Sequence, residues 1–142
     1  MKTMKVLFNA TIFFLLLTVF AVSSCSKYDE GSNFTFLSKT SRLVNTWKFK
    51  LWTANSEDIT AQNTISEVNI KKDNTIQVTY LLFGFNLVDN GTWAFNDDKT
   101  QFIWTKSTNE ITIYTILKLT KDELKLETSD SQAIYKITLV TK

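Results

Sequence analysis

Few residues of this 142-residue chain have the chemistry that a catalytic or metal site needs. The sequence contains no histidine and a single cysteine, so the commonest general base is absent and a cysteine–histidine metal site cannot be built. Two carboxylate pairs remain, Asp97-Asp98 and Asp122-Glu123. Paired carboxylates act as acid and base when they face each other about 5–10 Å apart in a cleft. Because both pairs lie in predicted turns, we expect solvated turn residues, and neither an enzyme nor a metal or cofactor site.

The single cysteine follows an apolar N-terminal segment. Lys2 and Lys5 give this segment a positive start, and residues 6–22 are almost wholly apolar. The apolar core is short for a membrane span, which needs about 20 apolar residues. A charged start, an apolar core of this length and the small residues Ser23 and Ser24 are typical of a secretory signal peptide. A lone cysteine in an exported chain cannot form an intrachain disulfide, so its presence needs another explanation.

The run Val22-Ser23-Ser24-Cys25 resembles a bacterial lipobox. The resemblance implies that residues 1–24 are removed as a lipoprotein signal peptide and that Cys25, the new first residue, carries acyl chains such as palmitate. Several acyl chains anchor a protein durably, because each buried CH₂ contributes about 0.8 kcal/mol. The alternative is an ordinary signal peptide followed by an incidental cysteine. We expect residues 5–22 to form a helix that does not contact the folded domain.

Residues 25–41 are predicted to be a tether that docks partly on the domain. A lysine and an acidic pair within residues 26–31 resemble the surface-export signal of Bacteroidetes-type lipoproteins. This resemblance implies the cell outer membrane, with the protein facing outward, whereas a plain solvated tether is the alternative. Removal of Lys2 and Lys5 with the signal leaves basic and acidic residues balanced. No basic excess therefore favours a nucleic-acid partner.

Residues 42–142 are predicted to form one all-β domain. Apolar and polar residues alternate through it, with turn signals about every ten residues. The predicted strands cover residues 43–51, 64–71, 75–82, 92–95, 101–105, 110–119, 124–127 and 133–140. Short connections favour antiparallel neighbours, and a meander of eight strands removes its edges by closing into an up-and-down barrel. Such a barrel is wide enough to be filled by side chains or to hold one small ligand.

The alternation predicts which side chains face the interior. In the first strand Leu51 shares a face with Trp47 and Phe49, so Trp52 is expected to face outward. In the strand at 110–119 the same reasoning places Ile111, Ile113, Leu117 and Leu119 inward, and Thr112, Tyr114 and Lys118 outward. Residues 81–88 are almost all apolar without a clear period, and residues 89–91 read as a turn. An exposed apolar interaction patch is expected at Trp52, Leu81, Phe83 and Phe85.

Large aromatic side chains could either line a cavity in the barrel or fill its core. The candidates are Trp47, Phe49, Tyr80, Trp93, Phe95, Phe102, Trp104 and Tyr135. Filling is the default in a barrel this small, because large aromatic rings bury much area and leave little void. A weaker alternative is carbohydrate binding on exposed rings of Trp52 or Trp104.

The motif Asn45-Thr46-Trp47 resembles the Gly-x-Trp signature of lipocalins, with Asn45 at the glycine position. Residues 91–102 and 119–126 are similar to the later hairpins of Bacteroidetes-type lipocalin-like lipoproteins. The resemblance covers most of residues 40–142 and implies a small lipid-anchored barrel that holds an apolar ligand. We therefore expect an outer-membrane lipoprotein of the cell envelope that binds a small apolar molecule. The alternative is a filled barrel that serves as an interaction or accessory subunit for an envelope protein partner.

Overall fold

The computed structural model describes residue 28 and residues 36–142. The predicted signal peptide at 1–24, its expected helix at 5–22 and the lipidation of Cys25 lie outside the described residues, as does most of the predicted tether. Within the described part, none of the helices combines the length and the apolar character that a membrane crossing requires.

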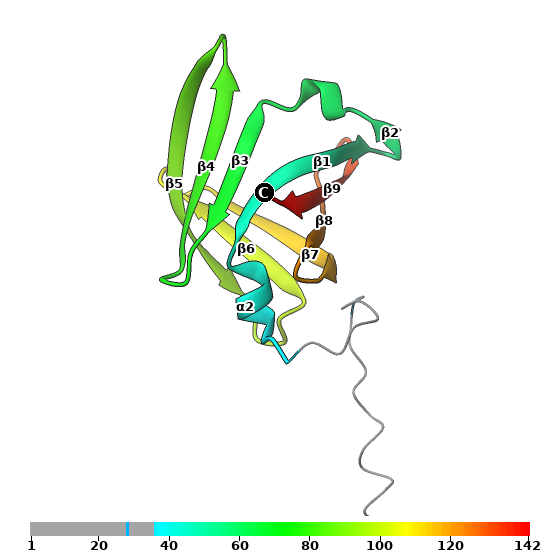
Figure 1. Ribbon diagram of the computed structural model, residues 1–142. Coiled ribbons are helices and arrows are strands. Elements are labelled where there is room, and N and C mark those ends of the chain that lie inside the picture. The colour runs from blue at the N-terminus through cyan, green and yellow to red at the C-terminus, as the bar shows by residue number, and fades with distance from the viewer. Residues whose placement is uncertain (1–27, 29–35) are drawn as a thin grey trace, which may run out of the picture.

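Eight antiparallel strands close into an up-and-down barrel, as predicted from the sequence (Figure 1). They are β1 (Thr46–Ala54), β3 (Ile65–Ile70), β4 (Thr75–Leu82), β5 (Phe85–Phe95), β6 (Gln101–Lys106), β7 (Ile111–Leu119), β8 (Glu123–Ser129) and β9 (Ile134–Thr141). Successive strands pair with each other, and β1 pairs with both β3 and β9, which closes the barrel. The connection from β1 to β3 contains the short strand β2 (Glu57–Asp58) and the 3₁₀ turn η1 (Thr60–Gln62).

A short helix, α2 (Lys39–Leu43), lies at one end of the barrel (Figure 1). Leu43 and Trp47 are fully buried there, and the indole N–H of Trp47 donates to the Leu43 carbonyl at 2.9 Å. Arg42 is also buried, and its guanidinium donates to the carbonyl of Leu119 at 3.2 Å. The sequence-based prediction had residues up to 41 in a tether and the first strand starting at 43, so α2 is a correction. We call the end that α2 covers the closed end.

A β-bulge in β1 reverses the predicted orientation of two side chains. The register between β1 and β9 shifts between Phe49 and Leu51, so Lys50 is an extra residue. Beyond the bulge Trp52 lies opposite Ile137 on the inner face, and Leu51 is exposed. The prediction that Leu51 faces inward and Trp52 outward is therefore wrong, because simple alternation does not reveal an inserted residue.

A second bulge has the same effect in β7. The register with β8 shifts between Ile116 and Lys118, which changes the phase of the preceding side chains. Tyr114 consequently faces the interior, whereas Ile111 and Ile113 are exposed. The predicted orientation of these three side chains is wrong for the same reason as in β1.

The β4–β5 hairpin is longer than its sequence suggested. Residues 89–91 were predicted to form a turn, but they lie within β5 and pair with β4. The hairpin instead closes at Phe83 and Gly84, which both have positive φ angles, 51° and 82°. Figure 1 shows this hairpin projecting from the end of the barrel opposite α2.

Candidate functional site

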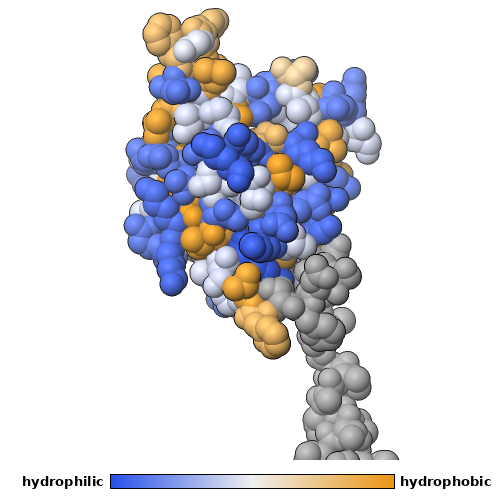
Figure 2. Space-filling model, viewed as in Figure 1, coloured by the Kyte–Doolittle hydropathy of each residue, from blue (hydrophilic) through white to orange (hydrophobic). Residues whose placement is uncertain are grey.

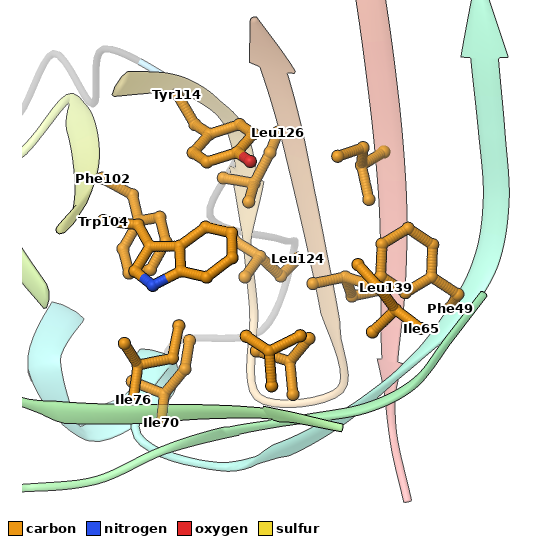
Figure 3. A pocket seen from close by; sticks show the side chains of 13 residues that line it. Phe49, Ile65, Ile70, Ile76, Phe102, Trp104, Tyr114, Leu124, Leu126 and Leu139 are labelled. Carbon is orange, nitrogen blue, oxygen red and sulfur yellow. The ribbon is translucent and has the colours of Figure 1, made fainter. Parts of the chain in front are cut away.

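An apolar cavity of about 60 Å³ lies inside the barrel and is partly open to solvent (Figure 3). Its walls come from 13 side chains: Phe49, Ile65, Val68, Ile70, Ile76, Val78, Phe102, Trp104, Tyr114, Leu124, Leu126, Ile137 and Leu139. Holding one water molecule takes roughly 10–15 Å³, and pockets for larger ligands measure about 300–1,000 Å³. The cavity therefore has room for a few heavy atoms, and a longer molecule would extend through its open side.

Three of the aromatic candidates from the sequence line this cavity, namely Phe49, Phe102 and Trp104. Tyr80 and Phe95 are partly buried and pack against the core. Figure 3 shows Trp104 and Phe102 on one side of the cavity and Phe49 on the opposite side. Both functions considered for these aromatics, cavity wall and core, are thus represented in the barrel.

Trp47 and Trp93 belong to the packed core and do not line the cavity. The indole N–H of Trp47 is bonded at the closed end as described above. The indole N–H of Trp93 donates to the carbonyl of Lys71 at 2.9 Å. Because both rings are fixed by backbone acceptors, they support the wall from behind and would not contact a ligand.

The aromatic wall continues through a chain of ring contacts. The ring of Phe102 stacks on Trp93, with centroids 6.3 Å apart and planes inclined by 27°, and lies 6.1 Å from Tyr114. Phe95 meets Trp93 edge to face at 5.5 Å. Such pairs contribute roughly 0.5–1.5 kcal/mol each beyond the area that they bury, so this side of the cavity is comparatively rigid.

Tyr114 is a wall residue that the sequence analysis placed outside. Burial raises its pKa to about 12, and the nearby Tyr80 and Glu110 act in the same direction. Its hydroxyl is therefore neutral at physiological pH. Together with the Trp104 indole it provides the polar groups of an otherwise hydrocarbon lining. The bulge in β7 was the missing information, and a single sequence carries no clear signal for it.

The indole ring of Trp104 packs against Gly91 of β5, a residue that has no side chain. A Cβ atom on Gly91 of β5 would collide with the carbonyl oxygen of Thr105 and lie 2.9 Å from Nε1 of Trp104. Gly91 therefore lets the indole ring and the β6 backbone approach β5 closely. This glycine, which looked like part of a turn, helps to position the cavity wall.

Trp52 and Tyr135 contact each other on the inner face, with ring centroids 6.3 Å apart. Neither ring lines the cavity. Trp52 is half-buried, so the prediction that it belongs to an exposed patch is wrong. Trp104 is only 8% exposed. Carbohydrate binding on an exposed Trp52 or Trp104 platform therefore has no support.

An exposed apolar surface does occur at the end of the β4–β5 hairpin, and we call it the hairpin tip. It comprises Leu81, Phe83, Phe85, Leu87 and Val88. Figure 2 shows hydrophobic atoms gathered there. Phe83 is 99% exposed and has a left-handed backbone conformation, which is unfavourable for a bulky residue.

Asp97 and Asp98 lie in the β5–β6 turn as predicted, whereas Asp122 precedes β8 and Glu123 is the first residue of that strand. Asp98 accepts from the Asn96 amide at 2.8 Å and from the Thr100 backbone N–H at 3.2 Å, which stabilises the β5–β6 turn. Glu123 lies 2.8 Å from the ammonium of Lys118, and this hydrogen bond lowers the pKa of Glu123. In the part of the chain that the structure describes, no three histidine, cysteine or acidic side chains gather into a metal-binding group.

Comparison with known proteins finds no family model and no curated protein that matches this chain. The lipocalin-like resemblance therefore stays a prediction, and the closed eight-stranded barrel is the level of similarity that the geometry supports.

Proposed function

We propose that this chain is a lipid-anchored, lipocalin-like protein of the cell outer membrane that binds a small apolar molecule inside its barrel. The observation that carries the proposal is the interior cavity of about 60 Å³ with its 13 lining residues, nearly all of them hydrocarbon. Transfer of apolar surface from water into such a site is favourable, at about 25 cal/mol per Å². No catalytic group is needed for this function, which is that of a carrier or sensor.

The position of helix α2 fits attachment through Cys25. The helix α2 follows the predicted tether in the sequence and lies at the closed end of the barrel (Figure 1). A lipid on Cys25 would then hold the domain from the closed end. A Cys25→Ala variant should lose labelled palmitate and remain uncut at this site, and a labelled band that survives the change would contradict the anchor.

Binding can be tested with small hydrocarbons of cavity size, such as methylenecyclopentane, added to the mature lipidated protein in nanodiscs. A molecule that binds only the folded state raises the unfolding temperature in proportion to ln(1 + [L]/Kd). The matched control is a Val78→Phe variant, in which a larger side chain occupies the cavity. The proposal predicts stabilisation of the natural protein and none of the control. Equal shifts for both proteins would indicate binding elsewhere.

A second candidate function is that of a protein-interaction subunit of an envelope complex. The hairpin tip favours it, because the Phe83 side chain is 99% exposed and packs against nothing in the fold, at a turn position where a positive φ is unfavourable for a bulky residue. A Phe83→Ser, Phe85→Ser double variant should remain folded and lose a crosslinked envelope partner. An Ile111→Ser variant, altered at an exposed isoleucine outside the tip, is the control. Crosslinks that persist in the double variant would exclude this role.

A further inference from the structure

The barrel is closed between β1 and β3 by its shortest ladder. These two strands pair only over residues 46–47 and 68–69, whereas all other neighbouring strands of the barrel are joined over at least four residue pairs. Beyond this short ladder β1 and β3 diverge, and the connection through β2 and η1 spans between their far ends (Figure 1). We call the part of the wall where they diverge, residues 48–51 of β1 with residues 65–67 of β3, the seam.

An extra residue on each side of the seam accounts for the divergence. Lys50 is the extra residue of β1, and Ser66 is that of β3, because the register with β4 shifts between Ile65 and Glu67. A β-bulge bends its strand and increases the local twist. Two bulges at nearly the same level therefore turn β1 and β3 away from each other. Bulges are frequent at barrel rims and beside functional sites, which makes the seam a candidate for such a site.

The seam adjoins the open side of the cavity. Phe49 and Ile65, one on each side of the seam, both line the cavity, and Figure 3 shows them on the same side of it. Nine of the 13 lining side chains are buried, and the four that are only partly buried are Phe49, Ile65, Ile137 and Tyr114. Three of these four belong to β1, β3 and the adjacent β9. The solvent-accessible part of the cavity wall is therefore concentrated at the seam.

Aromatic side chains stand in the alternative route along the barrel axis. Beyond the cavity, toward the end with the β4–β5 hairpin, the next inward-facing residues of β1, β9 and β4 are Trp52, Tyr135 and Tyr80. The rings of Trp52 and Tyr135 contact each other, with centroids 6.3 Å apart, and none of the three rings lines the cavity. At the opposite end α2 covers the barrel (Figure 1). The seam is therefore the least obstructed way into the cavity.

The charged side chains of the seam lie on its outer surface. Lys48 and Lys50 are exposed, and the carboxylate of Glu67 is paired with the ammonium of Lys142 at 2.8 Å. The two cavity-lining side chains of the seam are hydrocarbon. A molecule that leaves the cavity here passes apolar groups first and then reaches water. This order suits a hydrocarbon chain with one polar end, because the polar group stays hydrated while the chain is buried.

We propose that the ligand enters the cavity sideways through the seam, and that an elongated ligand leaves its outer part there, between Phe49 and Ile65. This inference rests on the proposed function and specifies the shape of the ligand and its route. A cavity of about 60 Å³ holds only a few heavy atoms, so the rest of a chain-like molecule needs a second apolar contact. The seam provides that contact from both of its strands.

The test places a bulky label on either of the two routes. Ser66→Cys puts a thiol at an exposed position of the seam, and the matched control Ser131→Cys puts one in the exposed β8–β9 turn, at the hairpin end of the barrel. Each variant of the mature lipidated protein is studied in nanodiscs before and after reaction with a bulky maleimide. Cys25 is predicted to carry lipid, and mass spectrometry confirms a single label. Lys48→Cys, across the seam, replaces Ser66→Cys if that variant does not fold.

Two alcohols serve as probes, 1-butanol, which is short enough for the cavity, and 1-octanol, which is not. Exchange of 1-butanol, measured by NMR relaxation dispersion of the cavity methyl groups, should slow about tenfold with the seam label, while its Kd stays within about twofold, because a blocked entrance slows entry and exit alike. Binding of 1-octanol should weaken about tenfold, the loss expected when about two methylenes lose their apolar cover. The label at position 131 should change neither quantity. Partition into the bilayer is the same before and after labelling and cancels.

The possible outcomes separate this inference from the function on which it rests. If the label at position 131 slows exchange and the seam label does not, the ligand enters through the barrel end, so the inference is wrong and the binding function stands. Equal effects of both labels, no effect of either label, or unchanged 1-octanol binding with the seam label also overturn the inference. If neither alcohol binds the natural protein, the inference and the proposed function both fail.

Discussion

Enlarging a valine in the cavity wall tests whether the interior space is real. Val78 and Val68 line the cavity and are 2% and 8% exposed. Val78→Ile and Val68→Ile each add one methylene while keeping a β-branched side chain, so the strand preference is unchanged. A cavity of about 60 Å³ has room for that group. Burying it should then contribute up to about 0.8 kcal/mol to the free energy of unfolding.

A filled core would respond in the opposite direction. An extra methylene forced into a close-packed interior typically costs about 1–3 kcal/mol. The two cases therefore differ in sign and by about 1–4 kcal/mol, which urea denaturation monitored by tryptophan fluorescence can measure. Val88→Ile, at an exposed position of the hairpin tip, is the control and should stay within about 0.5 kcal/mol. A loss of 1 kcal/mol or more in both wall variants, with an unchanged control, would refute the cavity.

Three further predictions follow from individual residues. Folded Tyr114 keeps its proton to about pH 12 and the unfolded chain only to about pH 10, so stability should fall by about 1.4 kcal/mol per pH unit between these values. Tyr80 and Tyr135 also have raised pKa values, so Tyr114→Phe should make the slope of stability against pH shallower by this amount, and identical slopes would contradict the burial of Tyr114. Phe83→Asn should raise the free energy of unfolding by about 1 kcal/mol, because asparagine tolerates a positive φ and precedes Gly84 in a tight hairpin turn; a destabilised variant would argue against strain at the tip. Gly91→Ala should lower the unfolding temperature and disturb the Trp104 indole signal, since its Cβ meets the Thr105 carbonyl; an unperturbed variant would show that the approach is not tight.

The barrel could be predicted from the sequence because strand alternation and turn spacing report on the backbone over long distances. Eight strands with short connections leave few alternatives to a closed meander. The predicted anchor residue Cys25 was also conspicuous in the sequence, and this prediction stays untested because Cys25 lies outside the residues that the structure describes.

The details of the interior were less accessible, because single inserted residues reverse the two-residue period. The bulge at Lys50 exchanges the faces of Leu51 and Trp52, and the bulge in β7 brings Tyr114 into the cavity. Neither bulge is marked by a glycine or a proline, so the residue types in the strand do not reveal it. Gly91 looked like a turn glycine because its requirement for close approach arises from β6, which is remote in the sequence.

The helix α2 was missed for a different reason. Residues 39–43 are too few to show a helical period, and their stability comes from tertiary contacts. The buried Leu43 and the hydrogen bond from Arg42 to Leu119 are such contacts. The local sequence pattern does not reveal these tertiary contacts.

Gentle mass spectrometry of the mature protein, purified from its native membrane, tests the central proposal most directly. The account predicts a reproducible bound molecule of small mass that is apolar and that is absent from the Val78→Phe variant prepared in parallel. A clean mass of the lipidated chain alone, after mild handling and in repeated preparations, would contradict a ligand-binding barrel.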